Sequence, residues 1–318
     1  MIPYTRKTLP NGLTVVVNRD RASKLAAVNI LYRVGARNEN PARTGFAHLF
    51  EHLMFRGTRA VENFDLPVQM ASGDNNAFTN NDYTDFYITL PKDNLETALW
   101  LESDRMEGLD ITPAKLEAEK KVVIEEFRQR YLNQPYGDQT MLLRALAYKV
   151  HPYRWAAIGL ATDHIAGATL ADVESFYRAH YRPSNAILSI SADMEEERML
   201  ELAEKWFAPL ADHPSATAAI PQEPMQTQAR RQEVERDVPA STVTVAYHMC
   251  ARTKLDFYTA DLVSDLLSGG DSGRLYTHLV KERNLLSSVN AYITGDVDPG
   301  LFVFTGQLLP GVTPEAAE

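Results

Sequence analysis

Two histidines and a glutamate stand together in the stretch HLFEH, residues 48–52. His48 and His52 are four residues apart, so on a helix they lie one turn apart on one face, with about 5–6 Å between their Cβ atoms. Two imidazoles at that spacing can both reach one zinc ion at about 2.0–2.1 Å. Glu51 lies beside them, where a carboxylate can hold and deprotonate a metal-bound water. These residue types therefore predict a hydrolytic metal centre.

A zinc site of this kind needs a third protein ligand and one open position. The candidates lie in KLEAEKKVVIEEFRQR, residues 115–130, after the helix start at Thr112-Pro113. Glu119 and Glu126 are seven residues apart, which is two helical turns, and so they share a face. One can bind the metal while the other supports a bound group from behind. The alternative is a solvated helix with Glu–Lys pairs. The apolar stretch VVI argues against it, because it indicates a buried face.

The elements that must position these residues are strands followed by helices. Runs rich in β-branched and aromatic residues predict strands, and capping residues such as the TLAD box at 169–172 mark helix starts. We expect strands over 13–20, 26–35, 75–80, 82–91 and 186–193, and helices over the HLFEH stretch up to Gly57, over 64–72, from Thr112 to about Asn133, after Thr169, and over 195–207.

The second half of the chain repeats the order of the first. A Pro-rich stretch with small residues at 211–229 has no apolar period and reads as a linker. After it, STVTVAYHMC, DLVSDLLSGG and SSVNAYIT followed by GLFVFTGQLLPG echo the strand, helix and strand pair of the first half. The sequence thus predicts an α+β fold with domains at 1–210 and 230–318. Each is one copy of a module of antiparallel strands with helices on one face. The second copy is predicted to be truncated.

Composition excludes several classes of function. The net charge is −10 and there is no block of Lys and Arg, so nucleic acid is not an expected partner. No apolar run is long enough for a membrane span, and the N-terminus has no apolar signal segment. The single cysteine, Cys250, cannot form an internal disulfide or a Cys-based zinc cluster. We expect a cytoplasmic protein, or a periplasmic one if a leader has been removed.

At this point the chain resembles a known family over its whole length. HLFEH followed by EKKVVIEEF is similar to the inverted-motif zinc peptidases related to pitrilysin and insulin-degrading enzyme, in the branch like mitochondrial processing peptidase. NGLTVVVNRD, GARNE, SGDNNAFTNNDYTDFYITLP and FYRAHYRPSNAILSISAD follow in the family's order. The resemblance implies one Zn²⁺ per chain, held by His48, His52 and Glu126, with Glu51 as general base and Glu119 as the supporting glutamate. Glu125 is the rival third ligand.

The resemblance also implies a way of holding peptide substrates. In the family, the segment matching NNAFT is a sheet edge that pairs with the main chain of an extended peptide. Asn76, Ala77 and Phe78 are therefore the expected substrate-binding residues. The alternative is a plain edge strand without a substrate.

The second half departs from the family in one respect. Members that work alone carry an Arg and a Tyr there, which bind substrate and stabilise the developing oxyanion. Here Val280 and Ser287 occupy the matching positions. We therefore expect a heterodimer in which this chain bears zinc and a related subunit without the zinc motif supplies the Arg and the Tyr. The rival reading is a non-catalytic structural or assembly subunit, a role that the same fold also serves.

Overall fold

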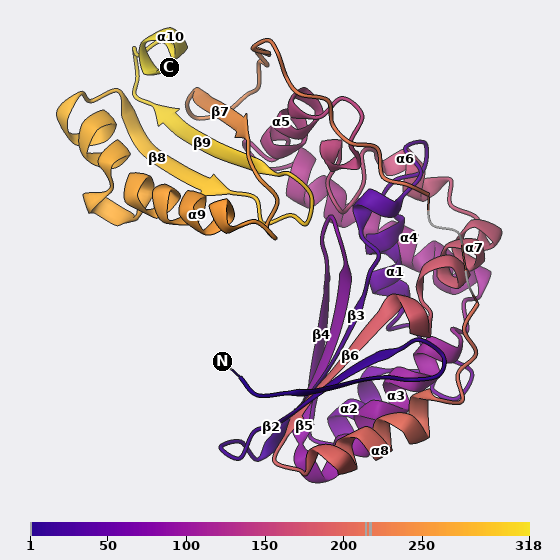
Figure 1. Ribbon diagram of the computed structural model, residues 1–318. Helices are drawn as coiled ribbons and strands as arrows, with labels where there is room; N and C mark the ends of the chain where they lie inside the picture. Colours follow the sequence, from indigo (N-terminus) through magenta and orange to yellow (C-terminus); the bar gives the residue numbers. More distant parts are fainter. Residues whose placement is uncertain (1, 214, 216–217) are drawn as a thin grey trace. The chain divides into compact units, whose positions relative to one another are not determined.

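The computed structural model describes residues 2–213, 215 and 218–318, and the chain forms two compact units (Figure 1). The first unit comprises Met1–Arg128 and His151–Gln222, and the second comprises Gln129–Val150 and Glu223–Glu318. The sequence did not indicate that 129–150 would group with the second unit. The domain limits at 210 and 230 remain predictions about where independent folding units divide.

The first unit is built on a sheet with the strand order β1-β2-β6-β3-β5-β4. Four of its five strand pairs are antiparallel, and the exception is the parallel pair β2–β6. Val28 lies at the centre, opposite Ile88 on one side and Ile190 on the other. The strands are β1 (Thr5–Thr8), β2 (Thr14–Arg19), β3 (Leu25–Tyr32), β4 (Asp74–Thr79), β5 (Thr84–Pro91) and β6 (Ala186–Ala192).

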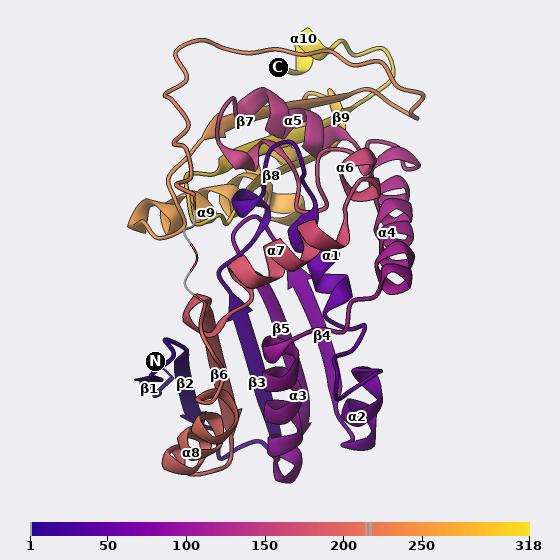
Figure 2. The ribbon, with the colours of Figure 1, turned by 90° about the vertical axis from the view of Figure 1, so that its right-hand side faces the viewer.

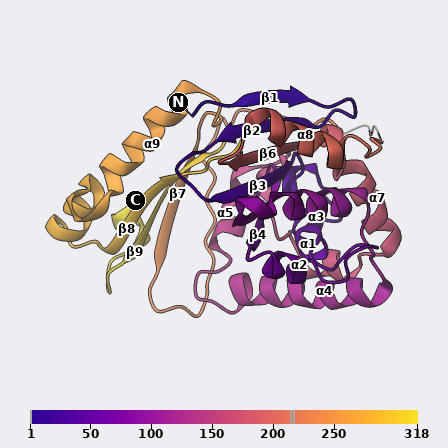
Figure 3. The same ribbon diagram turned by 90° about the horizontal axis from the view of Figure 1, so that it is seen from below.

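Alternation along these strands decides which face is covered. In β3 the side chains of Ala26, Val28, Ile30 and Tyr32 are fully buried, while the residues between them are more exposed. Figures 1 and 3 show helices α1, α3 and α8 together on one face of the sheet. The helices of this unit are α1 (Phe46–Leu53), α2 (Asp65–Met70), α3 (Leu95–Glu107), α4 (Pro113–Phe127), α6 (Thr162–Ala166), α7 (Leu170–His180) and α8 (Glu196–Phe207).

The second unit contains a smaller antiparallel sheet, which Figure 2 shows with its helix α9. Its strand order, β7-β9-β8, repeats the order β3-β5-β4 of the first unit. In both sheets the third strand along the chain lies between the first and the second. The elements are α5 (Gln139–Ala147), β7 (Thr242–His248), α9 (Leu255–Ser268), β8 (Leu286–Ile293), β9 (Leu301–Leu308) and α10 (Pro314–Ala317), with π-helical segments at Arg128–Leu132 and Tyr276–Glu282. Short 3₁₀ turns lie at Ala36–Asn38, Lys92–Asn94, Pro152–Arg154, Pro183–Asn185 and Gly270–Ser272.

The predicted fold class is confirmed: sheets that are mainly antiparallel carry helices on one face. The expected strands and helices of the first half are present within a few residues, and the capping box between Thr169 and Asp172 forms as predicted. The long helix after Thr112 is regular only to Phe127, because its last turn becomes the π-helical segment. Strand β1 and helices α3, α5, α6 and α10 were not expected. Among the described helices, none is both long and apolar enough to cross a membrane.

Candidate metal centre

Helix α1 carries the two histidines on one side and packs against the core with the opposite side. Leu49, Phe50 and Leu53 have no exposed surface, and the Phe50 ring stacks on Tyr181 with 5.2 Å between the ring centroids. The helix starts after Gly45, whose φ of +91° suits glycine. A Cβ at that position would also lie 2.5 Å from the carbonyl oxygen of Ile158. A larger residue at this position would therefore strain the backbone and displace the neighbouring loop at Ile158.

Helix α4 brings the glutamates against α1. The hydroxyl of Thr112 accepts a hydrogen bond from the backbone N–H of Lys115 at 3.2 Å, and Pro113 occupies the first turn. Val123 is buried on the same side as Glu119, which is 1% exposed. The expected buried face of this helix therefore exists, and it packs toward α1.

The structure brings His48, His52 and Glu126 together. One donor atom from each lies within 4.8 Å of the other two. Glu126 Oε2 is 3.4 Å from His52 Nε2 and 3.7 Å from His48 Nε2. These separations are wider than a good hydrogen bond. Two ligands held at 2.0–2.1 Å from one tetrahedral ion stand about 3.3 Å apart, which is close to the spacing observed. The donor set therefore fits a single zinc ion.

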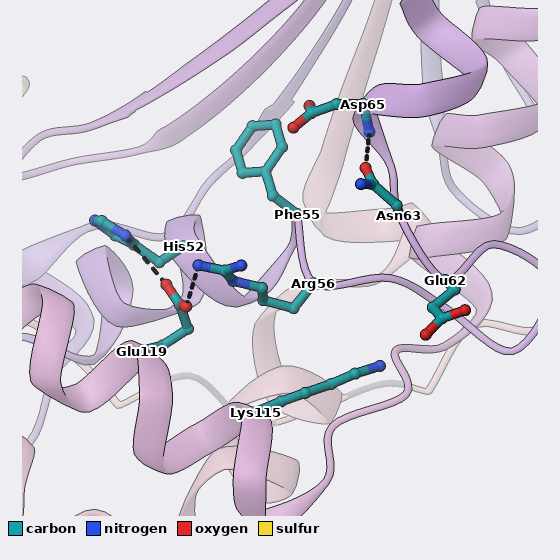
Figure 4. A pocket seen from close by; sticks show the side chains of 8 residues that line it. All are labelled: His52, Phe55, Arg56, Glu62, Asn63, Asp65, Lys115 and Glu119. Carbon is teal, nitrogen blue, oxygen red and sulfur yellow. Dashed lines mark hydrogen bonds and ion pairs between the residues drawn. The ribbon is translucent and has the colours of Figure 1, made fainter.

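Glu119 lies behind His52 rather than among the three donors. Its Oε2 is 3.4 Å from His52 Nδ1, and its Oε1 is 2.5 Å from Arg56 Nη2 (Figure 4). Burial lowers the pKa of His52, but the neighbouring carboxylates of Glu119 and Glu126 outweigh burial and raise that pKa to about 9. Both carboxylates thus favour positive charge at this imidazole, whether a proton or a metal ion supplies it.

The rival ligand Glu125 points elsewhere. Its side chain is 53% exposed, and its Oε2 lies 3.7 Å from Arg128 Nη1, one turn further along the chain. Glu126 is 20% exposed and faces the histidines. One residue along a helix turns the side chain by about 100°, which separates the two glutamates.

Glu51 lies in α1 between the two histidines and is half-buried. It is absent from the group of three converging donors. A carboxylate on the helix of the two histidines that is not itself part of the donor set suits a proton acceptor better than a ligand.

Strand β4 forms the edge of the sheet, since it pairs with β5 alone among the named strands. Exposure alternates along it, with Asn76 and Phe78 exposed and Ala77 less so. Phe78 is 44% exposed. Helix α1 contacts this strand, so the edge and the histidines belong to one neighbourhood.

In the second unit, Val280 lies in the π-helical segment Tyr276–Glu282 and Ser287 lies in β8. A valine cannot donate a hydrogen bond from its side chain, and the Ser287 hydroxyl is 3.3 Å from the Gln307 carbonyl oxygen. The substitution of the expected Arg and Tyr is therefore a real chemical difference.

Sequence reasoning missed Arg56. This residue is four positions after His52, a spacing that puts two residues on one face while a helix continues, but Arg56 falls just beyond the end of α1. It borders an open pocket of about 400 Å³ that His52, Glu119 and Lys115 also line (Figure 4). The spacing from His52 was a usable signal for it.

The chain belongs to peptidase family M16. Residues 14–156 match the family described as insulinase, and residues 167–318 match the peptidase M16 inactive domain. The His48, His52 and Glu126 cluster lies wholly within the first of these matches.

Proteins similar in sequence and in structure include named peptidases. The chain is 33% identical to the zinc protease PqqE of Helicobacter pylori, over 98% of this chain and 71% of that protein. It is 25% identical to a probable mitochondrial-processing peptidase subunit beta of Arabidopsis thaliana, over 94% of this chain and 59% of that one. A crystal structure of a protease from Helicobacter pylori superposes with a TM-score of 0.93 at 32% identity, covering 99% of this chain and 77% of that one.

Proposed function

We propose that this chain is the zinc-bearing subunit of an endopeptidase that hydrolyses peptides or unstructured polypeptide segments within a closed chamber. The observation that carries the proposal is the convergence of His48, His52 and Glu126, at separations that suit one ion. Membership of a peptidase family, and a similar protein named as a zinc protease, support it.

Each residue has a distinct part in the proposed reaction. Zinc, held by the two Nε2 atoms and Glu126 Oε2, would supply a Lewis acid that makes water acidic and polarises a carbonyl. The Glu51 carboxylate accepts a proton from water as the water oxygen attacks the peptide carbonyl carbon. It then passes that proton to the amide nitrogen as the C–N bond breaks. Glu119 Oε2 lies 3.4 Å from His52 Nδ1, where it favours a proton on that nitrogen and so leaves Nε2 for the ion.

The edge strand β4 is the proposed site of substrate capture. An extended peptide can pair with the outer main-chain edge of β4 at Asn76 to Phe78, where it would replace the 2.8 Å hydrogen bond that the Ala77 N–H donates to Asn76 Oδ1. Pairing of this kind tolerates many sequences. The exposed Phe78 ring can pack against one substrate side chain. Selection would therefore depend mostly on whether a segment is extended and flexible.

The third ligand is tested by two adjacent substitutions. Glu126→Gln is expected to weaken zinc binding on the order of 100-fold or more, since even residues that only support a ligand typically contribute 10–100-fold. Glu125→Gln is the matched control on the same helix and should bind zinc as the unmodified chain does. Competition against a chromophoric chelator measures both. Zinc loss in Glu125→Gln with retention in Glu126→Gln would contradict the assignment.

The heterodimer is proposed because Val280 and Ser287 replace the Arg and Tyr. The name of the Arabidopsis relative, a subunit beta, is consistent with such a pairing. We expect the purified chain alone to cleave an unstructured peptide poorly. Turnover should rise by at least about 100-fold when a related subunit carrying Arg and Tyr is added, the scale on which oxyanion donors act. Full turnover by the chain alone would refute the division of labour.

A second candidate is a non-catalytic assembly subunit, favoured by the same two replacements and by the match of residues 167–318 to a domain described as inactive. The two proposals differ in whether the metal centre is needed for catalysis or has no catalytic part. If the chain is only an assembly subunit, His52→Ala should leave complex formation intact, and no pairing with a related subunit should produce cleavage.

A further inference from the structure

A buried carboxylate lies outside the chemistry proposed above. Glu39, the last residue of the GARNE stretch, is 6% exposed and follows the 3₁₀ turn Ala36–Asn38. A glutamate is almost never buried unless its oxygens have partners. Its surroundings therefore need an explanation.

Both oxygens of Glu39 point at the beginning of α1. Oε2 accepts a hydrogen bond from the backbone N–H of Gly45 at 2.9 Å, and Oε1 accepts one from Ala47 at 2.8 Å. The first turn of a helix has N–H groups without helical acceptors, and its dipole favours negative charge. Gly45 has no side chain to cap the helix. Glu39 supplies the cap from six residues upstream.

The turn that carries Glu39 is itself held firmly. Trp155, which is 1% exposed, donates from Nε1 to the carbonyl oxygen of Ala36 at 3.0 Å. The backbone N–H of Ala36 donates to Asn80 and that of Arg37 to Asn81, at 3.1 and 2.9 Å. The carboxylate is thus mounted on a turn that Trp155, Asn80 and Asn81 hold from outside α1.

A two-point attachment constrains a helix more than a single cap does. One planar carboxylate that binds two N–H groups two residues apart limits both sliding along the helix axis and rotation about it. Ala47 directly precedes His48. The remaining donor, Glu126, comes from a different helix, so the three donors converge only if α1 keeps its place. Metal sites tolerate displacements of only about 0.5 Å.

We infer that Glu39 is a positioning residue for the metal centre: it sets the place and direction of α1, and with them the donor atoms of His48 and His52. This inference rests on the proposed zinc site. It assigns to the GARNE stretch a role that is distinct from catalysis and from metal binding.

Glu39→Gln tests the inference in the full chain. The amide keeps the shape and one acceptor oxygen but presents an NH₂ group to the other N–H donor, so one attachment point is lost. We expect about a 10-fold weaker zinc affinity, at the lower end of what supporting residues contribute. We also expect a changed absorption spectrum when cobalt(II) replaces zinc, since that spectrum reports the ligand geometry.

Asn11→Ala is the matched control. Asn11 Nδ2 donates to the carbonyl oxygens of Phe207 and Leu210, at 2.7 and 3.0 Å, and so fastens the end of α8, a helix that carries no metal donor. We expect this variant to lose stability to urea while its zinc affinity and cobalt spectrum stay unchanged.

The possible outcomes distinguish a failure of the positioning role of Glu39 from a failure of the proposed zinc site. If Glu39→Gln is less stable to urea but binds zinc and cobalt as the unmodified chain does, Glu39 is structural only and the inference is wrong. If the unmodified chain binds no zinc, the proposed function fails instead. Should Glu39→Gln not fold, Glu39→Asp is measured in the same assays. It keeps the charge but is one methylene too short to reach both N–H groups, so we expect an intermediate zinc affinity.

Discussion

Glu51→Gln should strongly slow peptide hydrolysis while leaving zinc bound. Glutamine has nearly the same shape as glutamate but cannot accept a proton from water at neutral pH. General-base catalysis typically contributes 10²–10⁴-fold, so we expect kcat to fall by about that factor. Zinc should be retained because Glu51 is not one of the three converging donors. Cleavage of an unstructured fluorogenic peptide, with the related subunit present, and metal analysis of the same sample measure the two quantities.

The control for this prediction is Glu125→Gln, which makes the same chemical change at an exposed position. It should cleave the peptide at the unmodified rate. If Glu51→Gln loses zinc, Glu51 is a ligand and the donor set has been assigned incorrectly. If it keeps both zinc and turnover, the proton acceptor lies elsewhere.

The parts of this site that could be predicted from sequence are those set by short-range helix geometry. The spacing of His48 and His52, and that of Glu119 and Glu126, places each pair on one helix face whatever the rest of the chain does. The choice between Glu125 and Glu126 depends on how α4 is rotated against α1. The spacing of residues along α4 does not determine this rotation, so the choice of Glu126 came from the resemblance to the family.

In the fold too, local sequence predicted only some of the elements. Strands β2 and β3 are rich in β-branched and other apolar residues and were expected, whereas β1 has the polar sequence TRKT, is exposed throughout and gives no such signal. The parallel pairing of β2 with β6 joins Thr14 to Ile187, and nothing local to either strand indicates it. Helix α3 was missed because two charged residues, Glu102 and Arg105, occupy positions in its buried face and obscure the apolar period.

That buried pair leads to the largest stability effect that we expect. Arg105 donates to Glu102 through Nε and Nη2, at 2.7 and 2.5 Å, and the two residues are 1% and 0% exposed. The guanidinium lies over the rings of Phe86 and Phe64, with 4.2 and 4.4 Å to the centroids. Burial raises the pKa of Glu102, and the attraction of Arg105 opposes that rise. The carboxylate is therefore tolerated in the core only because the guanidinium is beside it.

Arg105→Met should therefore lower the free energy of unfolding by about 3–5 kcal/mol, the usual cost of leaving a buried charge without its partner. Urea denaturation of the zinc-free protein measures it. Arg198→Met is the matched control: it breaks an exposed pair with Glu201 at the same i,i+3 spacing and should cost less than about 1 kcal/mol.

The double variant Glu102→Leu/Arg105→Met distinguishes the cost of an orphaned charge from the loss of packing. With both charges gone, the apolar side chains can pack against the same rings, and replacements of this kind are often neutral or stabilising. We expect the double variant to recover most of the stability that Arg105→Met loses. If it is as unstable as Arg105→Met, the guanidinium acts mainly through its contacts with the Phe64 and Phe86 rings, and the charge on Glu102 is not what makes Arg105 necessary.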